Sequence, residues 1–380
     1  MKRTLLITLD FPPQGGGVAN YWKNLCRFLN SDDLVVLTSE HEASLEFDQN
    51  EKYLIYRKDL FYQAKWIYPK WLKLLSETIH LVKQEEVKQI VVTHILPCGT
   101  VAYIIKKFFN IPYFVSLHGL DAAYAAKSWR KRFLSRLILK NSQGIIVNSQ
   151  YTKQLVGQNF KLKCDDKITI VYPCPNIDYE EIDEESLNIF KKEFRLENKK
   201  ILLTVARLVK RKGHDYVIKA LKQAIETIPN LVYLVVGKGV EESNLKDLVA
   251  GEGLIDKVLF FNDIQNSELP YFYSACDAFI MPSRLMSDGD VEGFGIVYLE
   301  ANSFGKPAIA GRSGGIPEAV EHARSGLLID PNSVEEISRA IVSLLNDQDV
   351  ARQMGEYASC RVIEQFNWTR QASKLINILS

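Results

Sequence analysis

Short apolar runs rich in valine and isoleucine alternate with longer helical patterns along the whole chain, which leaves few folds open. The runs in the first half cover residues 4–9, 34–37, 90–93, 113–117 and 144–148. Those in the second half cover residues 201–205, 232–236, 258–261, 278–281, 308–310 and 326–329. Continuous apolar strands separated by helices indicate parallel sheets that are covered on both faces. Two such series predict an α/β chain with two doubly wound domains.

The segment VYPCPNIDYEEI, residues 171–182, interrupts this alternation. Pro173 and Pro175 end regular structure there, and an acidic stretch follows them. We therefore predict an N-terminal domain over 1–175 and a C-terminal domain over 176–365. A last helix over 366–380 packs either on the second domain or back on the first.

Charge and cysteine usage exclude several classes of protein. The formal net charge is +1, from 47 basic and 46 acidic side chains, so nothing indicates a nucleic-acid partner. The 6 cysteines form no CxxC pair, which argues against a zinc site or redox dithiol and favours a reducing cytoplasm. The apolar run at the N-terminus is too short for the core of a signal peptide. No stretch approaches the roughly 18 apolar residues of a membrane-spanning helix.

Glycines and cations follow several of the predicted strands. Gly15, Gly16 and Gly17 stand between the first strand and a helical pattern, where backbone amides approach an anion closely. Arg207 and Lys212 follow the run 201–205 directly and suit a diphosphate. The alternatives are a flexible turn for the glycines and a solvated basic turn for the cations.

Within the basic segment, we interpret Lys210 and Arg211 as solvated. Gly237 begins a GxG after the run 232–236, which lines a nucleotide pocket in the functional interpretation but is weak as a dinucleotide fingerprint.

Glu292 and Glu300 lie eight positions apart in EGFGIVYLE. If a helix begins near Gly295, both carboxylates face a ligand at its N-terminus and suit paired hydroxyls of a sugar or ribose. The alternative is one acid that favours the helix dipole and one solvated acid. A second glycine loop follows at 313–315.

These segments together resemble the GT4 family of retaining glycosyltransferases. The matching motifs are PPQGGG, SLHGLD, VARLVKRKGHD, EGFGIVYLE and GRSGGIPEAV, in the expected order from residue 12 to residue 320. The resemblance implies the GT-B fold, in which two Rossmann-like domains face each other across a cleft.

The resemblance also implies roles for individual residues. Arg207 and Lys212 would hold the donor diphosphate, Glu300 the ribose and Glu292 the transferred sugar. His118 would lie beside the sugar at the reacting carbon, although a lone histidine after a strand is more often structural. The remaining donor-binding residues that it implies are Gly16, Gly17, Gly293, Phe294, Gly295, Ile296 and Val297, and Gly237 joins them through its GxG.

The sequence around the glutamates is similar to mannosyltransferases that act on phosphatidylinositol lipids. We therefore expect transfer of a hexose, first of all mannose from GDP-mannose, to a lipid-linked or glycan acceptor by same-face substitution without a metal ion or other cofactor. UDP-glucose or UDP-N-acetylglucosamine is the alternative donor. An NAD-dependent oxidoreductase is the alternative of another class, since it shares two Rossmann-like halves and the GxG.

Two basic and aromatic stretches, 127–140 and 65–73, suit an anionic membrane surface. The alternative for 127–140 is a helix that packs its apolar face on the sheet. We expect a cytoplasmic protein that binds peripherally to the inner face of the cell membrane.

Overall fold

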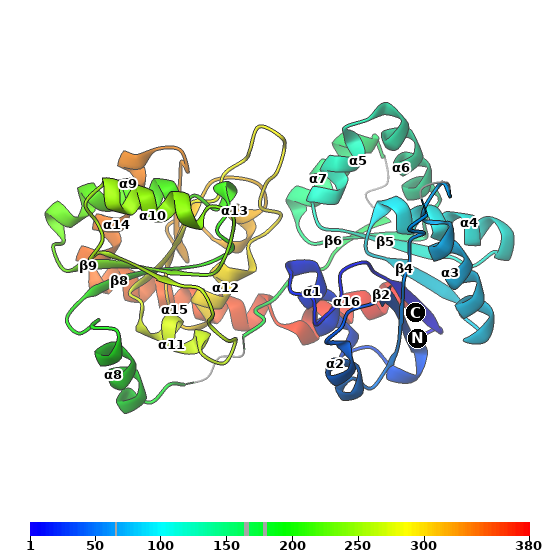
Figure 1. Cartoon of the computed structure of the whole chain (residues 1–380), viewed down its shortest axis with the longest axis horizontal. Helices are drawn as coiled ribbons and strands as arrows, with labels where there is room; N and C mark the ends of the chain where they lie inside the picture. Colours follow the sequence, from blue (N-terminus) through cyan, green and yellow to red (C-terminus); the bar gives the residue numbers. More distant parts are fainter. Residues whose placement is uncertain (65–66, 163–166, 178–180) are drawn as a thin grey trace. The chain divides into compact units, whose positions relative to one another are not determined.

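The computed structural model describes residues 1–64, 67–162, 167–177 and 181–380. Its internal contacts divide the chain into two compact units (Figure 1). Unit 1 contains Met1–Pro173 and Trp368–Ser380, and unit 2 contains Cys174–Asn367. The two ends of the chain therefore belong to the same unit.

Unit 1 is built on a parallel sheet with the strand order β3-β2-β1-β4-β5-β6-β7. Its strands are β1 (Thr4–Ile7), β2 (Leu34–Ser39), β3 (Leu54–Lys58), β4 (Gln89–Val92), β5 (Tyr113–Leu117), β6 (Gly144–Val147) and β7 (Ile168–Ile170). β1 pairs with both β2 and β4, so Leu6 lies opposite Val36 on one side and Val91 on the other. The strand order reverses between β1 and β4, and sheets of this kind bind ligands at that switch point.

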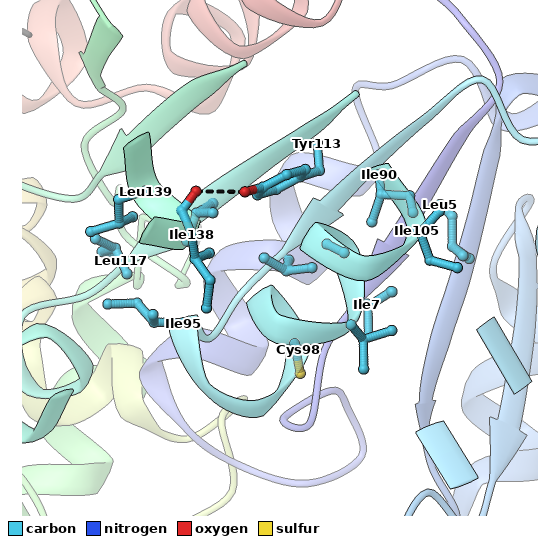
Figure 2. Close-up of a cluster of buried hydrophobic side chains, with 14 of the residues drawn as sticks. Leu5, Ile7, Ile90, Ile95, Cys98, Ile105, Tyr113, Leu117, Ile138 and Leu139 are labelled. Carbon is cyan, nitrogen blue, oxygen red and sulfur yellow. Dashed lines mark hydrogen bonds between the residues drawn. The ribbon is translucent and has the colours of Figure 1, made fainter. Parts of the chain in front are cut away.

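Both faces of this sheet are buried, because successive strand residues point to opposite faces and helices cover each face. Leu5 enters the core cluster shown in Figure 2, where the Tyr113 hydroxyl donates a 2.5 Å hydrogen bond to the Ile138 carbonyl oxygen. Leu6 enters a second cluster on the other face, which includes Leu375 from the end of the chain. The alternation of apolar residues along β1 thus feeds two cores.

The helices of unit 1 connect these strands and add one segment from the end of the chain. Ser149 caps α7, since its hydroxyl accepts a 3.0 Å hydrogen bond from the Thr152 amide. The helices are α1 (Gly17–Cys26), α2 (Ser44–Asn50), α3 (Leu72–Gln84), α4 (Thr100–Phe109), α5 (Leu120–Ala126), α6 (Trp129–Asn141), α7 (Gln150–Phe160) and α16 (Trp368–Leu379), with short turns η1 (Ser31–Asp33) and η2 (Ile95–Gly99).

Unit 2 repeats the same topology, with the strand order β10-β9-β8-β11-β12-β13 and parallel pairing throughout. Its strands are β8 (Lys200–Val205), β9 (Leu231–Val236), β10 (Val258–Phe261), β11 (Ala278–Met281), β12 (Ala308–Gly311) and β13 (Gly326–Ile329). Here the strand order reverses between β8 and β11. The segments that follow these two strands therefore meet at the switch point of unit 2.

Helices again cover this sheet, and α9 packs beside α14 on one face. Val217 and Leu221 of α9 share a buried cluster with Leu202 of β8 and Ile341 of α14. The elements are α8 (Glu184–Glu193), η4 (Lys210–Lys212), α9 (His214–Thr227), α10 (Glu242–Gly251), α11 (Leu269–Ala275), α12 (Ile296–Ser303), α13 (Ile316–Ala319), α14 (Val334–Asn346) and α15 (Gln348–Gln365).

The predicted fold class is confirmed: both units are Rossmann-like α/β domains with parallel sheets. All eleven predicted runs contain strands, whereas the prediction missed β3 and β7. These two are the edge strands of unit 1, and their residues are only half-buried or exposed, so they lack a continuous apolar run. In the part of the chain that the structure describes, no helix has both the length and the hydropathy to cross a bilayer.

Candidate functional site

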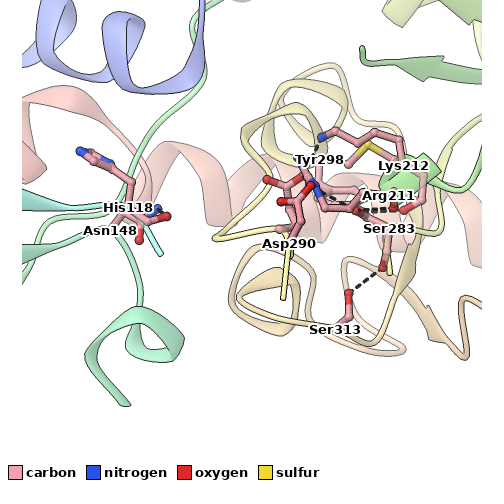
Figure 3. Close-up of polar contacts among 10 residues, drawn as sticks. His118, Asn148, Arg211, Lys212, Ser283, Asp290, Tyr298 and Ser313 are labelled. Atoms are coloured by element: carbon pink, nitrogen blue, oxygen red, sulfur yellow. Dashed lines mark hydrogen bonds and ion pairs between the residues drawn. The ribbon is translucent and has the colours of Figure 1, made fainter. Parts of the chain in front are cut away.

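Charged side chains gather at the switch point of unit 2. Arg211 and Lys212 lie in η4, which follows β8, and Asp290 and Glu292 lie in the segment between β11 and α12. Both cations donate to the same carboxylate oxygen, Oε2 of Glu292, each at 2.6 Å. Arg211 also donates from Nε to Oδ2 of Asp290 at 3.2 Å. We call these four residues the charged cluster (Figure 3).

The charged cluster is largely withdrawn from water, since Arg211 is 8% exposed and Lys212 is 9% exposed. Burial alone would raise the pKa of Glu292, but attraction to Lys212 and Arg211 outweighs burial and lowers that pKa to about 2. Burial lowers the pKa of Lys212, and attraction to Glu292 opposes this effect. Glu292 is therefore ionised at neutral pH, so that its oxygens accept hydrogen bonds and do not donate them.

The two predicted diphosphate-binding cations differ in their surroundings. Lys212 is buried against Glu292, whereas the Arg207 side chain is exposed and makes no ion pair within the described residues. Lys210 is exposed, as expected for a solvated residue. The prediction that Arg211 is solvated was wrong, because η4 turns its guanidinium toward Asp290 and Glu292. Adjacent cations in one basic segment gave no signal that distinguished them.

Two glycines bring the segment after β9 against the segment after β8. A Cβ atom on Gly237 would overlap the carbonyl oxygen of Ala206, and one on Gly239 would overlap that of Leu208. Backbone bonds close the contact, with the Leu208 amide donating to the Lys238 carbonyl oxygen at 2.9 Å. The GxG here lets two backbones meet beside Arg207, and its role in lining a nucleotide pocket stays a prediction.

The glycine loop at 313–315 lies against the backbone of Glu292 and Gly293. The Gly315 amide donates to the Glu292 carbonyl oxygen at 3.0 Å, and a Cβ atom on Gly314 would overlap that same oxygen. The Ser313 hydroxyl donates to the Ser283 carbonyl oxygen at 2.6 Å (Figure 3). Main-chain contacts from this loop therefore fix the backbone of Glu292 in the charged cluster.

The predicted donor-binding segment leads into α12. Gly295 precedes the helix with a φ of 93°, and α12 starts at Ile296 and continues through Val297. Phe294 is buried, and its ring packs on Phe366 with centroids 5.7 Å apart. α12 begins at Ile296, and the first bond of its turn runs from the Tyr298 amide to the Gly295 carbonyl oxygen at 3.2 Å, so the Ile296 and Val297 amides precede the helical bonds.

Glu300 lies on α12 with partners of its own. Its Oε2 accepts a 2.9 Å hydrogen bond from the Tyr273 hydroxyl, and its Oε1 accepts a 3.3 Å bond from the Asn176 amide. Burial raises the pKa of Glu300, and the bonds from Tyr273 and Asn176 oppose this effect. The two predicted glutamates thus belong to separate hydrogen-bonding groups within unit 2.

A second pair of side chains marks the switch point of unit 1, and the sequence analysis missed it. Asp10 follows β1 and His94 follows β4, and Asp10 Oδ2 lies 3.4 Å from His94 Nε2. The hydrogen bond from His94 lowers the pKa of Asp10. The other ring nitrogen, Nδ1, lies 2.8 Å from the hydroxyl of Thr93. Both residues stand directly after strands that flank the reversal, a signal that only the strand order makes visible.

His118 follows β5 and is held on several sides. Its Nε2 lies 3.3 Å from the Ser116 hydroxyl, and its ring meets Tyr21 edge-on with centroids 5.1 Å apart. Its amide donates to Asp121 Oδ1 at 3.1 Å, and Asn148 donates from Nδ2 to its carbonyl oxygen at 3.3 Å. Figure 3 shows Asn148 beside it. Burial, together with the charge of His94, lowers the pKa of His118 to about 3, so the imidazole is neutral near pH 7.

The glycines before α1 leave open space. Gly16 precedes α1 and Gly17 begins it, and no side chain caps the helix. A Cβ atom on Gly15, Gly16 or Gly17 would meet nothing within 4 Å. The backbone before α1 is therefore not crowded by neighbours, and anion binding there stays a prediction.

Two family models match the chain. The model described as Glycosyltransferase Family 4 matches residues 15–179, and the model described as Glycosyl transferases group 1 matches residues 185–361. The first match lies almost entirely in unit 1 and the second lies in unit 2. Both units are thus similar to known glycosyltransferase domains.

Relatives and solved structures match over the full length. The GDP-mannose-dependent alpha-(1-6)-phosphatidylinositol monomannoside mannosyltransferase of Mycobacterium tuberculosis is 28% identical, over 100% of this chain and 98% of the relative. The GDP-mannose-dependent monoacylated alpha-(1-6)-phosphatidylinositol monomannoside mannosyltransferase of Corynebacterium glutamicum is 29% identical, with the same coverage of 100% and 98%. The crystal structure of Anabaena HepE in complex with UDP has a similar fold, with a TM-score of 0.85 at 19% identity over 100% of this chain and 99% of that one.

Proposed function

Because the chain belongs to the GT4 family of glycosyltransferases, we propose that it transfers a hexose from a nucleotide-sugar to a lipid-linked or glycan acceptor with retention at the anomeric carbon. The charged cluster is the observation that carries this proposal, since Arg211 and Lys212 hold Glu292 at the switch point of unit 2. Family membership also leaves no role for the NAD-dependent oxidoreductase that the GxG had allowed.

The donor that we propose is GDP-mannose. Full-length relatives from Mycobacterium tuberculosis and Corynebacterium glutamicum are named as GDP-mannose-dependent enzymes, which favours mannose. UDP-glucose or UDP-N-acetylglucosamine remains the alternative, and the similar HepE structure contains UDP. In the proposal, Arg207 and Lys212 bind the diphosphate, while Glu292 and Glu300 accept hydrogen bonds from hydroxyls of the sugar and ribose.

A donor screen tests the choice of nucleotide. We expect GDP-mannose to raise the melting temperature and to be slowly hydrolysed, whereas UDP-glucose and UDP-N-acetylglucosamine do neither. A ligand at 100 times its dissociation constant stabilises the folded state by about 2.7 kcal/mol, which a melt detects easily. If only UDP-sugars stabilise the protein, the proposed donor is wrong, but the proposed glycosyl transfer still stands. No binding and no hydrolysis with any nucleotide-sugar would refute the proposal.

The proposed chemistry is substitution on one face of the sugar. Negative charge builds on the departing diphosphate, and cations aimed at it stabilise the transition state more than the ground state. The leaving phosphate oxygen accepts the proton of the acceptor hydroxyl. His118 takes a hydrogen-bonding role toward the sugar, and its low pKa supports a neutral imidazole in that role.

A double displacement through Glu292 is the less favoured mechanism. Its Oε2 already accepts two charge-assisted hydrogen bonds of 2.6 Å, and its pKa is about 2. Such a weakly basic carboxylate is a poor nucleophile but a good acceptor for sugar hydroxyls. A glycosyl adduct on Glu292, trapped with a fluorinated donor and detected by mass spectrometry, would reverse this preference.

No metal ion or other cofactor enters the proposed reaction. Arg207, Lys212 and the amides at the start of α12 supply the positive charge that a diphosphate leaving group needs. We expect the rate of transfer to stay the same after dialysis against EDTA. Loss of activity that Mg²⁺ restores would contradict this part of the proposal.

The acceptor side of the proposal places α6 on an anionic membrane surface. Ile138 and Leu139 of α6 are buried in the core of unit 1, but Trp129 and Phe133 are 75% and 68% exposed. Exposed cations accompany these two aromatic residues: Lys127 just before the helix, and Arg130, Lys131, Arg132, Arg136 and Lys140 along it. The helix therefore packs on the sheet with one face and leaves aromatic and basic groups for lipid headgroups.

The second stretch, 65–73, gives less support. Lys65 and Trp66 lie outside the described residues, and Tyr68 is exposed. Trp71 packs against the core of unit 1, and Lys73 forms a 2.9 Å ion pair with Asp59. These last two residues have partners within the protein, so the membrane proposal rests on α6.

Flotation with liposomes tests the membrane surface. We expect binding to phosphatidylglycerol vesicles at low salt, weaker binding at high salt, and no binding to phosphatidylcholine vesicles. Trp129→Ala with Phe133→Ala should abolish flotation. Ile363→Ala, which truncates an exposed apolar side chain on α15, is the matched control and should float normally. Unchanged flotation of the α6 variant would exclude this surface.

A further inference from the structure

Arg211 makes contacts that no assigned role explains. It is the cation with two acidic partners in the charged cluster, Glu292 through Nη1 at 2.6 Å and Asp290 through Nε at 3.2 Å. Its backbone is fixed as well, because its carbonyl oxygen accepts bonds from the Ser283 hydroxyl at 3.1 Å and the Arg284 amide at 2.9 Å. The planar guanidinium fork suits this arrangement, since it reaches two carboxylates without moving.

Lys212 is bound differently and can change its partner. Among the described residues its ammonium has one acidic partner, Glu292, at 2.6 Å. A lysine ammonium is a compact charge on a flexible four-carbon stem, so it can turn from a carboxylate to a phosphate at little cost in geometry. The proposed function requires this turn, because an ammonium that Glu292 neutralises contributes little to a diphosphate.

If Lys212 moves to a phosphate, Glu292 loses one of its two cationic partners. The Glu292 side chain is 15% exposed, and a buried carboxylate that loses its counter-charge is strongly destabilised. We propose that Arg211 is a positioning residue that holds the Glu292 carboxylate charged and in place while Lys212 transfers to the donor diphosphate. This inference rests on the proposed function and adds to it a residue that touches neither phosphate nor sugar.

The charges of the cluster allow Arg211 to stay with the acids while Lys212 moves to the donor. Arg211 and Lys212 offset Asp290 and Glu292, so the cluster is neutral before a donor arrives. When Lys212 pairs with a phosphate, Arg211 still donates to each acid, so one guanidinium serves two carboxylates and these three residues carry one net negative charge. One cation is thereby freed for the donor without leaving a buried acid alone.

A double-mutant cycle measured by binding tests whether Arg211 acts through Glu292. The probe is GDP-mannose, titrated by calorimetry into wild type, Arg211→Met, Glu292→Gln and the double variant. We expect Arg211→Met to weaken binding by roughly 10- to 100-fold in the wild-type background, as charge-assisted bonds of this kind are worth about 1.5–3 kcal/mol. In the Glu292→Gln background the same substitution should change binding less than about 3-fold, because the two side chains share one interaction.

The acid limb of the pH profile gives a second readout. The charged and titratable groups that face Glu292 in the described structure are Arg211 and Lys212 from η4, Asp290 from its own segment and Tyr298 from α12. Removing Arg211 takes away a cation that lowers the Glu292 pKa, so the acid limb of kcat/KM should move to higher pH. Arg211→Lys keeps a cation beside Glu292, so the acid limb should return most of the way to its wild-type pH. A variant that simply misfolds would not show this return.

The outcomes separate this inference from the proposed function. Arg284→Met serves as the control for loss of a buried, ion-paired arginine, since Arg284 pairs with Asp215 at 2.9 Å and touches neither acid of the cluster. If wild type binds GDP-mannose but Arg211→Met loses the same factor in both backgrounds, the inference is overturned. If wild type binds GDP but no nucleotide-sugar, the proposed function fails instead. The same mutant cycle, repeated with GDP as the probe, then still tests whether Arg211 holds Glu292 while Lys212 moves to a phosphate.

Discussion

Glu292 and Glu300 show how environment decides the behaviour of a side chain. Both are buried glutamates near the start of α12, yet two cations lower the pKa of Glu292 to about 2 and burial raises the pKa of Glu300. Glu300 receives only neutral donors, from the Tyr273 hydroxyl and the Asn176 amide, in the described structure. The two carboxylates therefore make opposite contributions to stability as the pH changes.

The pH dependence of stability follows from these directions. A depressed folded pKa means that Glu292 stabilises the fold above its unfolded pKa and loses this effect as the pH falls toward 2. A raised folded pKa means that Glu300 destabilises the fold above its unfolded pKa and does so less as the pH falls. We expect Glu292→Gln to lower the melting temperature at pH 7 and Glu300→Gln to raise it, with both differences shrinking toward pH 4. For Glu292 the effect is on the order of 3 kcal/mol. Melts between pH 4 and 8 measure both, and two differences of equal sign would contradict the assignment.

Lys212 and its neighbour Lys210 form a matched pair for catalysis. Lys212 is buried against Glu292, whereas Lys210 begins the same turn and is exposed. We expect Lys212→Ala to lower kcat by on the order of 100-fold, the scale for losing one preorganised donor. Lys210→Ala should leave kcat unchanged. Steady-state rates with saturating donor decide this, and near-normal turnover of Lys212→Ala would remove the residue from the mechanism.

The sequence predicted part of the charged cluster and missed the rest for physical reasons. Lys212 and Glu292 were recognisable because their motifs carry the family resemblance. Arg211 was not, since neighbouring cations look alike until the backbone of η4 decides which one faces inward. Asp10 and His94 meet only because β1 and β4 are adjacent in the sheet. Pairings of this kind depend on strand order, which local patterns do not contain.

At the scale of elements, apolar patterns predict the centre of each sheet better than its edge. Central strands such as β1 and β9 are buried throughout, so their sequences are continuous apolar runs. The edge strand β3 reads LIYRK and exposes Leu54 and Lys58 at its two ends, and its pattern has no clear period. Of the helix starts that the sequence analysis named, α12 begins at Ile296 where a start near Gly295 was expected, and α16 begins at Trp368 where residue 366 was expected.

Close main-chain contacts make some glycines irreplaceable, and Gly237 tests this. Its φ is 139°, and a Cβ atom there would overlap the Ala206 carbonyl oxygen. We expect Gly237→Ala to destabilise unit 2 by about 1–3 kcal/mol, as overpacking does, and to weaken donor binding. Gly251→Ala at the end of α10 is the control, because nothing lies within 4 Å of a Cβ there. Urea unfolding measures both, and equal midpoints would show that the contact relaxes freely.

At the scale of the whole molecule, the two units have the same strand order up to the sixth strand of each sheet. Each unit places its charged pair or cluster where that order reverses, Asp10 with His94 in unit 1 and the charged cluster in unit 2. The repeated alternation of strands and helices was enough to predict two such domains. It could not place the last helix, because an amphipathic helix can cover an apolar face of either one.

The structure assigns that helix, α16, to unit 1, and its buried face tests the assignment. Leu375 and Leu379 lie in the same cluster as Leu6 of β1, and Gln89 donates from Nε2 to the Leu379 carbonyl oxygen at 2.7 Å. We expect Leu375→Ala to destabilise unit 1 by about 2–5 kcal/mol, the range for truncating a buried leucine. Asn377→Ala, on the exposed face of α16, should have little effect. Hydrogen exchange followed segment by segment separates the units, because amides of β1, β2 and β4 should exchange faster in Leu375→Ala while those of β8, β9 and β11 keep their protection. Equal loss of protection in both sheets would contradict the assignment, because α16 would then stabilise unit 2 as much as unit 1.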